Sequence, residues 1–481
     1  MQATSTTPTR RRVRGDPRTS RTTDPQTGGS SSALLFYAYL VLLAFEWLGL
    51  QTEIAPLRAI RFTTLLGYCL FIVVVAQQGI REIAGRPQAR IFFTLITLTI
   101  ASMSWAVVTK TAFDSIRPLV DYTVFFVLTA ALVDRRERII KLAWTLALVC
   151  AVLVFRNFEK LGQTLRVGGF KAGYFLGDGN DFAWGMVIAL PLIAFLILGR
   201  KDILSRVAGL AGVSVCLLGI VGTGSRGGSL ALGASLLFYL VFISEKKAAA
   251  LAAVAAIGLA IAVVAPGSYF ARMKTVATYE EDSSAQSRLL LWGYAFQMAT
   301  DFPLGVGAGN FASAYGRYYA PVGERSANAN DVAWGQGRWL NAHSIYFKAL
   351  GEYGFIGFFM MIGIVFMNLR QSLGLRKALV NQPDAPIPCE WAGLVAMSFC
   401  GFAIAGIFLG GLAYPHVFLL SGLIVAISRV VDPIASTTRV VRHRSIPESR
   451  VTTGAAQRPG ARTRRAAPAD RTSNGGANGR T

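Results

Sequence analysis

The sequence predicts an all-α fold, a polytopic bundle of transmembrane helices, and three observations support this. Of the 481 residues, 53% are hydrophobic, only 15% are charged, and the mean hydropathy is +0.46. In a soluble domain, about a quarter of the residues are charged. Many apolar runs reach the roughly 17–25 residues that a helix needs to cross a bilayer. About twelve such runs follow one another, with no repeat of fixed period.

These runs define the expected spans in order. The first nine are expected near residues 33–50, 62–79, 91–108, 119–133, 139–155, 182–199, 204–221, 228–244 and 248–265, and the last three near 344–367, 391–409 and 414–428. The fourth is short for a span. The expected organisation is a basic cytoplasmic head (1–32), spans 1–9 (33–266), a large periplasmic loop (267–343), spans 10–12 (344–430) and a basic cytoplasmic tail (431–481).

The net charge of +22 is concentrated in the two ends and in alternate loops between the runs. Lys and Arg mark the cytoplasmic side of a membrane protein, so both termini are expected in the cytoplasm. The compositions of the head and tail are typical of disordered segments, and nucleic-acid binding is not expected. The loop 156–181 is an exception, because its basic residues fall on the outer side. Either the number of spans differs from twelve at this place or these residues meet an anionic group, and the second interpretation is favoured.

The long loop contains the stretch "SRLLLWGYAFQMATDFP", which predicts an amphipathic helix. Leu289, Trp292, Phe296 and Ala299 recur at helical spacing, and Pro303 follows where a helix would end. Such a helix would lie on the outer leaflet.

Ionisable residues in and beside the spans share one depth. Because charged groups inside a membrane are rare and usually functional, their common depth predicts a polar site at the outer boundary. The residues concerned are Glu46, Asp121, Asp178, Asp181, Arg226 and His343.

The stretch "GTGSRGGSL" has features of an anion site. Gly227 and Gly228 would allow a tight turn and a close backbone approach, and Thr223 and Ser225 offer hydroxyl groups. The free N–H groups at the start of the next helix favour an anion, and Arg226 adds a planar fork suited to phosphate. The alternative is an arginine that snorkels from a glycine turn. The pattern of a P-loop is absent.

The stretch "RWLNAHSIYFKALGEYGFIGF" offers an imidazole at the entrance of a span. Either His343 or His416 could serve an outer reaction, and His343 is favoured. Lys348 and Glu352 are four residues apart and can neutralise each other. In "GDGND", Asp178 or Asp181 could instead only cap the sixth span. The five cysteines lie in or beside apolar runs, so no disulfide framework is expected, and no metal or cofactor is expected either.

Several of these pieces together resemble the O-antigen ligase and polymerase superfamily of bacterial inner-membrane glycosyltransferases. They are "TGSRGGSLAL", "RLLLWGYAFQMATDFPLGVGAGNF" and "NAHSIYFKALGEYGFIGF", in that order, with the long outer loop between spans nine and ten. "YTVFFVLTAALVDRRERI", "GDGNDFAWGMVIALPL" and "WGQGRWLNAHSIYFKALGEYGFIGF" resemble O-glycosylation ligases associated with exosortase systems. The likeness extends over residues 34–429.

The resemblance implies a metal-independent, inverting transfer at the periplasmic face of the inner membrane. A glycan would leave an undecaprenyl-diphosphate carrier and join an acceptor hydroxyl on a lipid, protein or polymer. It implies that Arg226 and Arg288 hold the diphosphate and that His343 activates the acceptor. Further contacts with diphosphate or glycan are expected from Thr223, Ser225, Gly227, Arg338, Asp178, Asp181 and Glu352.

Two alternatives remain open at this stage. A polymerase of the same superfamily would use a second lipid-linked unit as acceptor. A transporter or lipid flippase would have discontinuous helices and polar groups near the membrane midplane.

Overall fold

The structure is a computed structural model that describes residues 25–161, 170–199, 202–275, 283–320, 340–380, 382 and 385–444. Side chains are described in these ranges except for residues 25–31, 199, 283–284 and 432–444. The chain divides into two compact units at Pro433, and the first contains the long helices up to that residue. Of the second unit, only residues 434–444, which are helical, fall within the described ranges.

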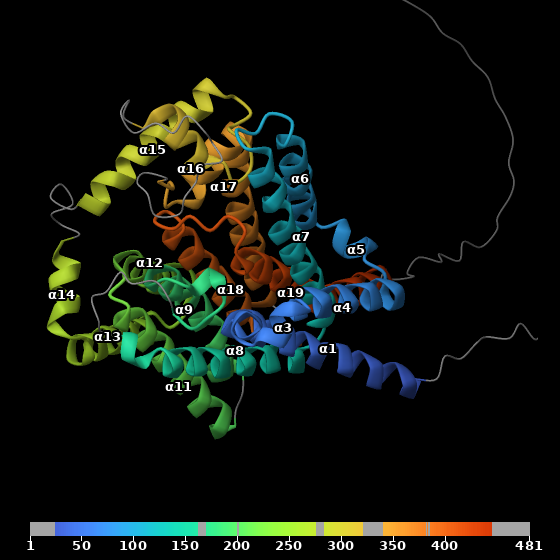
Figure 1. The fold of residues 1–481 in the computed structure, drawn as a ribbon. Coiled ribbons are helices and arrows are strands. Elements are labelled where there is room, and N and C mark those ends of the chain that lie inside the picture. Colours follow the sequence, from blue (N-terminus) through green and yellow to red (C-terminus); the bar gives the residue numbers. More distant parts are fainter. Residues whose placement is uncertain are drawn as a thin grey trace, which may run out of the picture. The chain divides into compact units, whose positions relative to one another are not determined.

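Helices make up the fold, and the described residues contain no β-strand, so the predicted all-α class is confirmed (Figure 1). The longer helices are α1 (Pro25–Leu48), α4 (Phe62–Gln78), α6 (Pro87–Ser102), α7 (Thr109–Leu132), α8 (Arg136–Arg156), α9 (Gly179–Ile193), α11 (Ile203–Gly222), α12 (Arg226–Phe238), α13 (Lys247–Val264), α15 (Ser283–Asp301), α17 (Ile345–Val380), α18 (Cys389–Ala405) and α19 (Pro415–Arg444). The shorter ones are α2 (Leu50–Glu53), α3 (Ala55–Ala59), α5 (Arg81–Ala84), α10 (Phe195–Gly199), α14 (Gly267–Lys274) and α16 (Phe311–Ala314), with single turns η1 (Phe158–Lys160), η2 (Tyr174–Leu176), η3 (Tyr239–Ile243) and η4 (Tyr315–Tyr319).

The long helices are those of an integral membrane protein. Among the described residues, seven helical stretches are long and apolar enough to cross a bilayer, and four shorter apolar helices lie at 32–48, 62–78, 389–405 and 415–431. The 16-residue α6 belongs to neither group. The total of twelve spans therefore stays a prediction.

The helix limits follow the apolar runs with one notable difference at α7. The fourth run, expected at 119–133, is the second half of a 24-residue helix that begins at Thr109. The polar lead-in and the internal Pro118 hide this extension from a reading of hydropathy alone. Pro118 is tolerated because a neighbouring turn can adjust inside a bundle.

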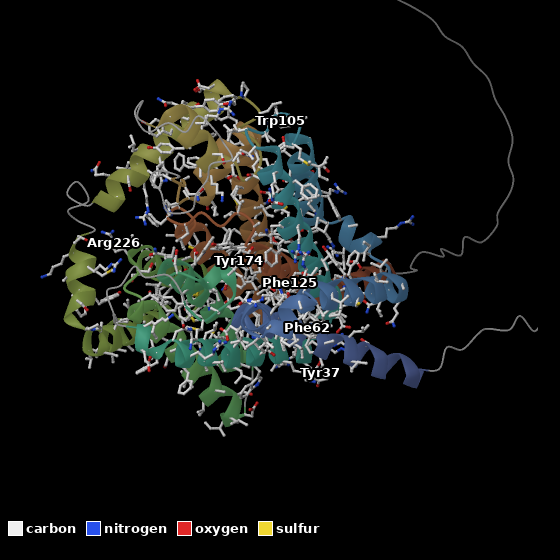
Figure 2. All side chains as sticks on the ribbon, viewed as in Figure 1. Tyr37, Phe62, Trp105, Phe125, Tyr174 and Arg226 are labelled. Carbon is white, nitrogen blue, oxygen red and sulfur yellow. The ribbon has the colours of Figure 1, made fainter. Side chains whose placement is uncertain are left out.

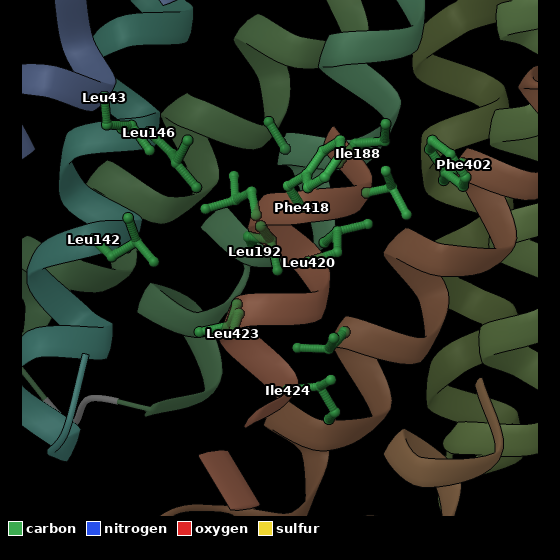
Figure 3. Packing of buried hydrophobic residues seen from close by; sticks show 14 of the residues in the cluster. Leu43, Leu142, Leu146, Ile188, Leu192, Phe402, Phe418, Leu420, Leu423 and Ile424 are labelled. Atoms are coloured by element: carbon green, nitrogen blue, oxygen red, sulfur yellow. The ribbon is translucent and has the colours of Figure 1, made fainter. Parts of the chain in front are cut away.

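α9, α18 and α19 occupy the interior of the bundle, whereas α13 lies at its edge. Of the most apolar stretch in α9, 78% of the residues are buried, against 6% in α13. Figure 3 shows Ile188 of α9, Phe402 of α18 and Leu420 of α19 among the packed side chains of the core. The apolar surface of α13 is therefore left for lipid.

Hydrogen bonds identify one end of the bundle, here called the site end. Ser225, which caps α12, donates to Asn180 in the first turn of α9, at 2.9 Å. Ile345, the first residue of α17, donates its N–H to Gly406, which follows α18, at 2.9 Å. Arg156, the last residue of α8, donates to the carbonyl of Leu48, the last residue of α1, at 3.0 Å. The site end thus gathers the starts of α9, α12 and α17 with the ends of α1, α8 and α18.

α17 is broken near the site end at Gly354. Its φ of 64° and ψ of −161° are not helical. The break has a local cause: the carbonyls of Gly351 and Glu352 accept hydrogen bonds from Val306 and Gly307, at 2.9 and 3.0 Å, instead of continuing the helix. Gly354 also approaches Pro303 so closely that a methyl group here would lie 2.2 Å from the Pro303 carbonyl oxygen.

Candidate functional site

The turn before α12 is built from its own small and hydroxyl residues. Gly224 has a φ of 60°, in the left-handed region that glycine adopts without strain. Ser225 caps the helix, because its Oγ accepts the N–H of Gly228 at 3.1 Å. Thr223 Oγ1 donates to the Ile220 carbonyl at 2.8 Å, so this hydroxyl stabilises the end of α11.

The predicted role of Gly227 and Gly228 in the turn is wrong. Both lie inside α12, where the absence of a side chain permits close packing. A methyl group at Gly228 would lie 2.6 Å from Ala183 Cβ, and one at Gly227 would lie 3.2 Å from Phe408 Cβ. The backbone N–H groups of the first turn of α12 still point toward the turn that precedes it, the arrangement that favours an anion.

Arg226 is the first residue of α12 and is half-buried beside α14 (Figure 2). Its Nη1 donates to Thr275 Oγ1 at 2.8 Å, directly after α14. A second bond joins the two helices, since Tyr269 donates to Ser229 Oγ at 3.1 Å. Arg226 is thus held in place by α14 beside the helix start, which a purely snorkelling side chain would not need.

Arg272 of α14 is a further cation that the sequence reasoning missed. A methyl group at Gly224 would lie 3.6 Å from Arg272 Cδ and 3.9 Å from its Nη1. Two arginines therefore flank the glycine–hydroxyl turn. Pro266, which caps α14 in the sequence, was the available signal for a helix here.

His343 has an unusual backbone that its neighbours hold in place. Its φ of 46° is left-handed, which costs a residue with a Cβ about 1–2 kcal/mol. On one side, Trp292 Nε1 of α15 donates to the Ala342 carbonyl at 2.9 Å, and the Trp292 ring stacks on Phe347 with centroids 4.7 Å apart. On the other side, the bond from Ile345 to Gly406 fixes the start of α17. Backbone strain of this kind is common at functional sites.

Arg288 lies one turn before Trp292 on the same face of α15, which directs it toward the His343 segment. Although His343 reaches the surface, protein atoms crowd its ring. The main effect is that the crowded ring loses contact with water, which lowers the pKa of His343 below its ordinary value of 6.5; the positive charge of Arg288 lowers it further. The negative charge of Asp178 raises this pKa, and the positive charge of Lys348 lowers it. Arg288, Asp178 and Lys348 are thus all within electrostatic reach of the imidazole.

The helix predicted in the long loop is present as α15, and it ends at Asp301 before Pro303 as expected. The position on the outer leaflet stays a prediction, and Leu289 and Phe296 of the predicted apolar face are 47% and 54% exposed. A second apolar face, formed by Leu291, Ala295 and Met298, is buried. This face packs on α17, so α15 forms part of the folded unit at the site end.

The two aspartates at the start of α9 have different partners. Asp178 caps the helix, accepting the N–H groups of Asn180 and Asp181 at 2.7 and 2.9 Å, as the capping alternative predicts. Asp181 is buried and accepts the hydroxyl of Tyr414 at 2.9 Å. Burial, and then the nearby Asp181, raise the pKa of Tyr414 above its ordinary value, so Tyr414 stays a donor.

Glu352 connects α17 to the loop before α16. Its carboxylate lies 3.9 Å from Lys348 Nζ, the pair predicted from their spacing, and it lies near the backbone N–H groups of Gly309 and Phe311. These neighbours show that Glu352 faces other residues of its own chain. Its predicted contact with a substrate stays a prediction.

The remaining predicted residues fall elsewhere. His416 is fully buried among Trp47, Phe175 and Trp184, so the preference for His343 as the accessible imidazole has structural support. Arg338 lies outside the described residues, as do residues 162–169 of the basic outer loop. In the described part of that loop, Arg156 pairs with Glu53 of this chain.

Glu46 and Asp121 lie apart from the other predicted residues, and Asp121 lies in the middle of α7 rather than at its end. They lie between α1, α4 and α7, where Tyr122 donates to Glu46 at 2.8 Å and Tyr68 donates to Asp121 at 2.7 Å. The polar residues of the site end therefore form two groups. The cationic group contains Arg226, Arg272, Arg288, His343 and Lys348, and the carboxylate group contains Glu46 and Asp121.

Within the described ranges, no three His, Cys, Asp or Glu side chains come together as metal ligands, and all five cysteines are free thiols.

The fold defines an integral membrane protein that carries several cationic side chains at one end of its helical bundle. Residues 211–362 match the model of the family described as O-antigen ligase. This match supports the O-antigen ligase superfamily and points to a membrane glycosyltransferase. It contains Arg226, Arg288 and His343. No curated protein matches the chain.

Proposed function

We propose that the chain is a ligase that transfers a preassembled glycan from an undecaprenyl-diphosphate carrier to an acceptor hydroxyl at the periplasmic face of the bacterial inner membrane. The observation that carries the proposal is that Arg288 and Lys348 lie within electrostatic reach of an accessible imidazole, at the end of the bundle where Arg226 and Arg272 flank the turn before α12. The likeness to the exosortase-associated branch is part of the proposal. In the mechanism, the acceptor oxygen attacks the anomeric carbon, and the bond from that carbon to the diphosphate breaks with inversion.

The arginines have a direct role in this step. As the glycosidic bond breaks, negative charge grows on the leaving diphosphate, and fixed cations aimed at it lower the barrier. Arg226 at the helix start and Arg288 above it are proposed to bind the two phosphates, with the N–H groups of α12 in support. In this proposal they supply the charge that a metal ion supplies in many other glycosyltransferases.

His343 is proposed to take the proton of the acceptor hydroxyl. A general base must be neutral before the reaction, and the lowered pKa keeps the imidazole neutral at pH 7. Arg288, which is proposed to bind the diphosphate, therefore also helps to keep the base neutral.

The broken helix at Gly354 does not favour the transporter alternative. Discontinuous helices in transporters free their backbone groups for a substrate. Here the carbonyls freed at the break are bonded to Val306 and Gly307 of the same chain.

The proposal is tested by transfer in proteoliposomes with a polyprenyl-diphosphate-linked glycan as donor. Replacement of Arg226, Arg288 or His343 by Ala should each lower transfer at least about 100-fold, the usual effect of removing a group that stabilises developing charge. Arg370→Ala, an exposed residue toward the other end of α17, is the matched control and should transfer normally.

Undiminished transfer by all three variants would refute the assignment. Product length on a gel separates ligase from polymerase, because a ligase gives a single shift of the acceptor and a polymerase gives a ladder.

A further inference from the structure

A second polar cavity lies between α1, α4 and α7. Its volume is about 370 Å³, and its wall includes Glu46, Asp121, Arg117, Tyr68 and Tyr122. Figure 2 labels two further wall residues, Phe125 and Tyr174. Because buried ionisable groups are costly in a membrane bundle, a cavity lined by several of them indicates a function.

The side chains of this wall are already oriented by one another. Tyr122 and Tyr68 each donate to one carboxylate oxygen, of Glu46 and Asp121. Arg117 Nε lies 3.4 Å from the other oxygen of Asp121, and its Nη2 donates to Thr64 at 2.9 Å. A carboxylate offers about four lone-pair sites, so Glu46 and Asp121 both retain acceptor capacity toward the cavity.

This combination suits a polyhydroxylated ligand. Sugar hydroxyls can donate to the carboxylates and accept from the arginine, and aromatic rings can pack against the sugar C–H face. Of the three carboxylates in the wall, Asp114 pairs with Lys110 and Asp121 with Arg117, so the wall offers mainly hydrogen-bond acceptors and no unpaired cation for a phosphate or an acidic sugar. The cationic site has the opposite preference.

We propose that the cavity binds an uncharged sugar unit, while the cationic site binds the diphosphate. The assignment of this sugar to the glycan or acceptor of the reaction rests on the proposed function; the binding of a sugar here does not.

The cavity borders the cationic site through a pair of tyrosines. Tyr174 of the cavity wall packs edge-on against Tyr414, with centroids 5.9 Å apart, and donates to the Ala413 carbonyl at 3.0 Å. Tyr414 donates to Asp181 at the start of α9. A saccharide chain whose reacting end lies at His343 would therefore have a neighbouring pocket for one of its units.

The test measures sugar binding directly, without transfer, on the purified full chain in detergent micelles. Saturation-transfer NMR would compare maltose, diacetylchitobiose, a uronic-acid disaccharide and inorganic pyrophosphate. We expect at least one of the two neutral disaccharides to bind, and the acidic one to bind more weakly. Glu46→Gln and Asp121→Asn keep the shape of each side chain and should weaken neutral sugar binding about tenfold, the effect of losing one charged hydrogen bond.

Glu53→Gln is the matched control, since it makes the same change in an exposed carboxylate that pairs with Arg156 outside the cavity. It should bind sugar as the unmodified protein does, and none of the three variants should change pyrophosphate binding. Tyr122→Phe, which removes the hydroxyl that orients Glu46, should weaken sugar binding without removing a charge.

Neutral sugar binding that is absent, equal in all variants, or displaced by pyrophosphate would overturn the proposal. A failure of the proposed function has a different signature. In that case Arg226→Ala and His343→Ala would still transfer glycan, while the sugar-binding pattern of Glu46→Gln and Asp121→Asn would stand.

Discussion

Gly354 is predicted to be the position where a single methyl group does most damage to the site end. Gly354→Ala forces a residue with a Cβ into a φ and ψ of 64° and −161°, a backbone region that is essentially restricted to glycine. That strain costs about 1–3 kcal/mol. The new methyl group would also lie 2.2 Å from the Pro303 carbonyl oxygen, and relieving such overpacking costs about 1–3 kcal/mol more.

The free energy of unfolding is therefore expected to fall by about 3 kcal/mol, measured by titration of the purified protein from mild detergent into SDS. Gly363→Ala, nine residues further along α17, is the control. It lies in helical backbone with nothing within 4 Å of the new methyl group, and should be neutral or up to about 1 kcal/mol more stable. Equal stability of the two variants would refute the account of the break in α17.

Two further predictions concern His343. The transfer rate should decrease at a pH below 6.5, because the neutral imidazole is the active form and its pKa is lowered. Lys348→Gln should raise this pKa and move the decrease to higher pH, whereas Asp178→Asn should lower the pKa and move the decrease to lower pH. A pH profile that neither substitution moves would exclude His343 as the base. Trp292→Phe keeps the stack on Phe347 but removes the hydrogen bond to the residue before His343. The turnover rate should fall about fivefold with KM little changed, the effect of one lost hydrogen bond, whereas an equal rise in KM alone would assign Trp292 to substrate binding.

Much of the helical frame could be predicted from the sequence, because bilayer thickness dictates the length of an apolar run. The start of α7 could not, since its first residues are polar and only the packing against α4 and α6 makes them helical. The face of α15 that packs on α17 could not be predicted either. Apolar residues cover most of its circumference, so spacing alone does not distinguish the exposed Leu289 and Phe296 from the buried Leu291 and Met298.

The location of the candidate site could also be predicted only in part from the sequence. Depth in the membrane can be read from position within a span, and Arg226 and His343 do lie at the same end of the bundle. Lateral position cannot be read in this way. Glu46 and Asp121 line a cavity of their own, and Arg272 comes to the α12 turn only because α14 folds back onto it.

The most direct test of the central claim is mass spectrometry of acceptor material from cells that lack the gene and are complemented with either the unmodified chain or His343→Ala. The account predicts an acceptor heavier by one glycan with the unmodified chain, and an unmodified acceptor with accumulated lipid-linked glycan for the variant. Identical acceptor masses in both strains would contradict a role for His343 in glycan transfer.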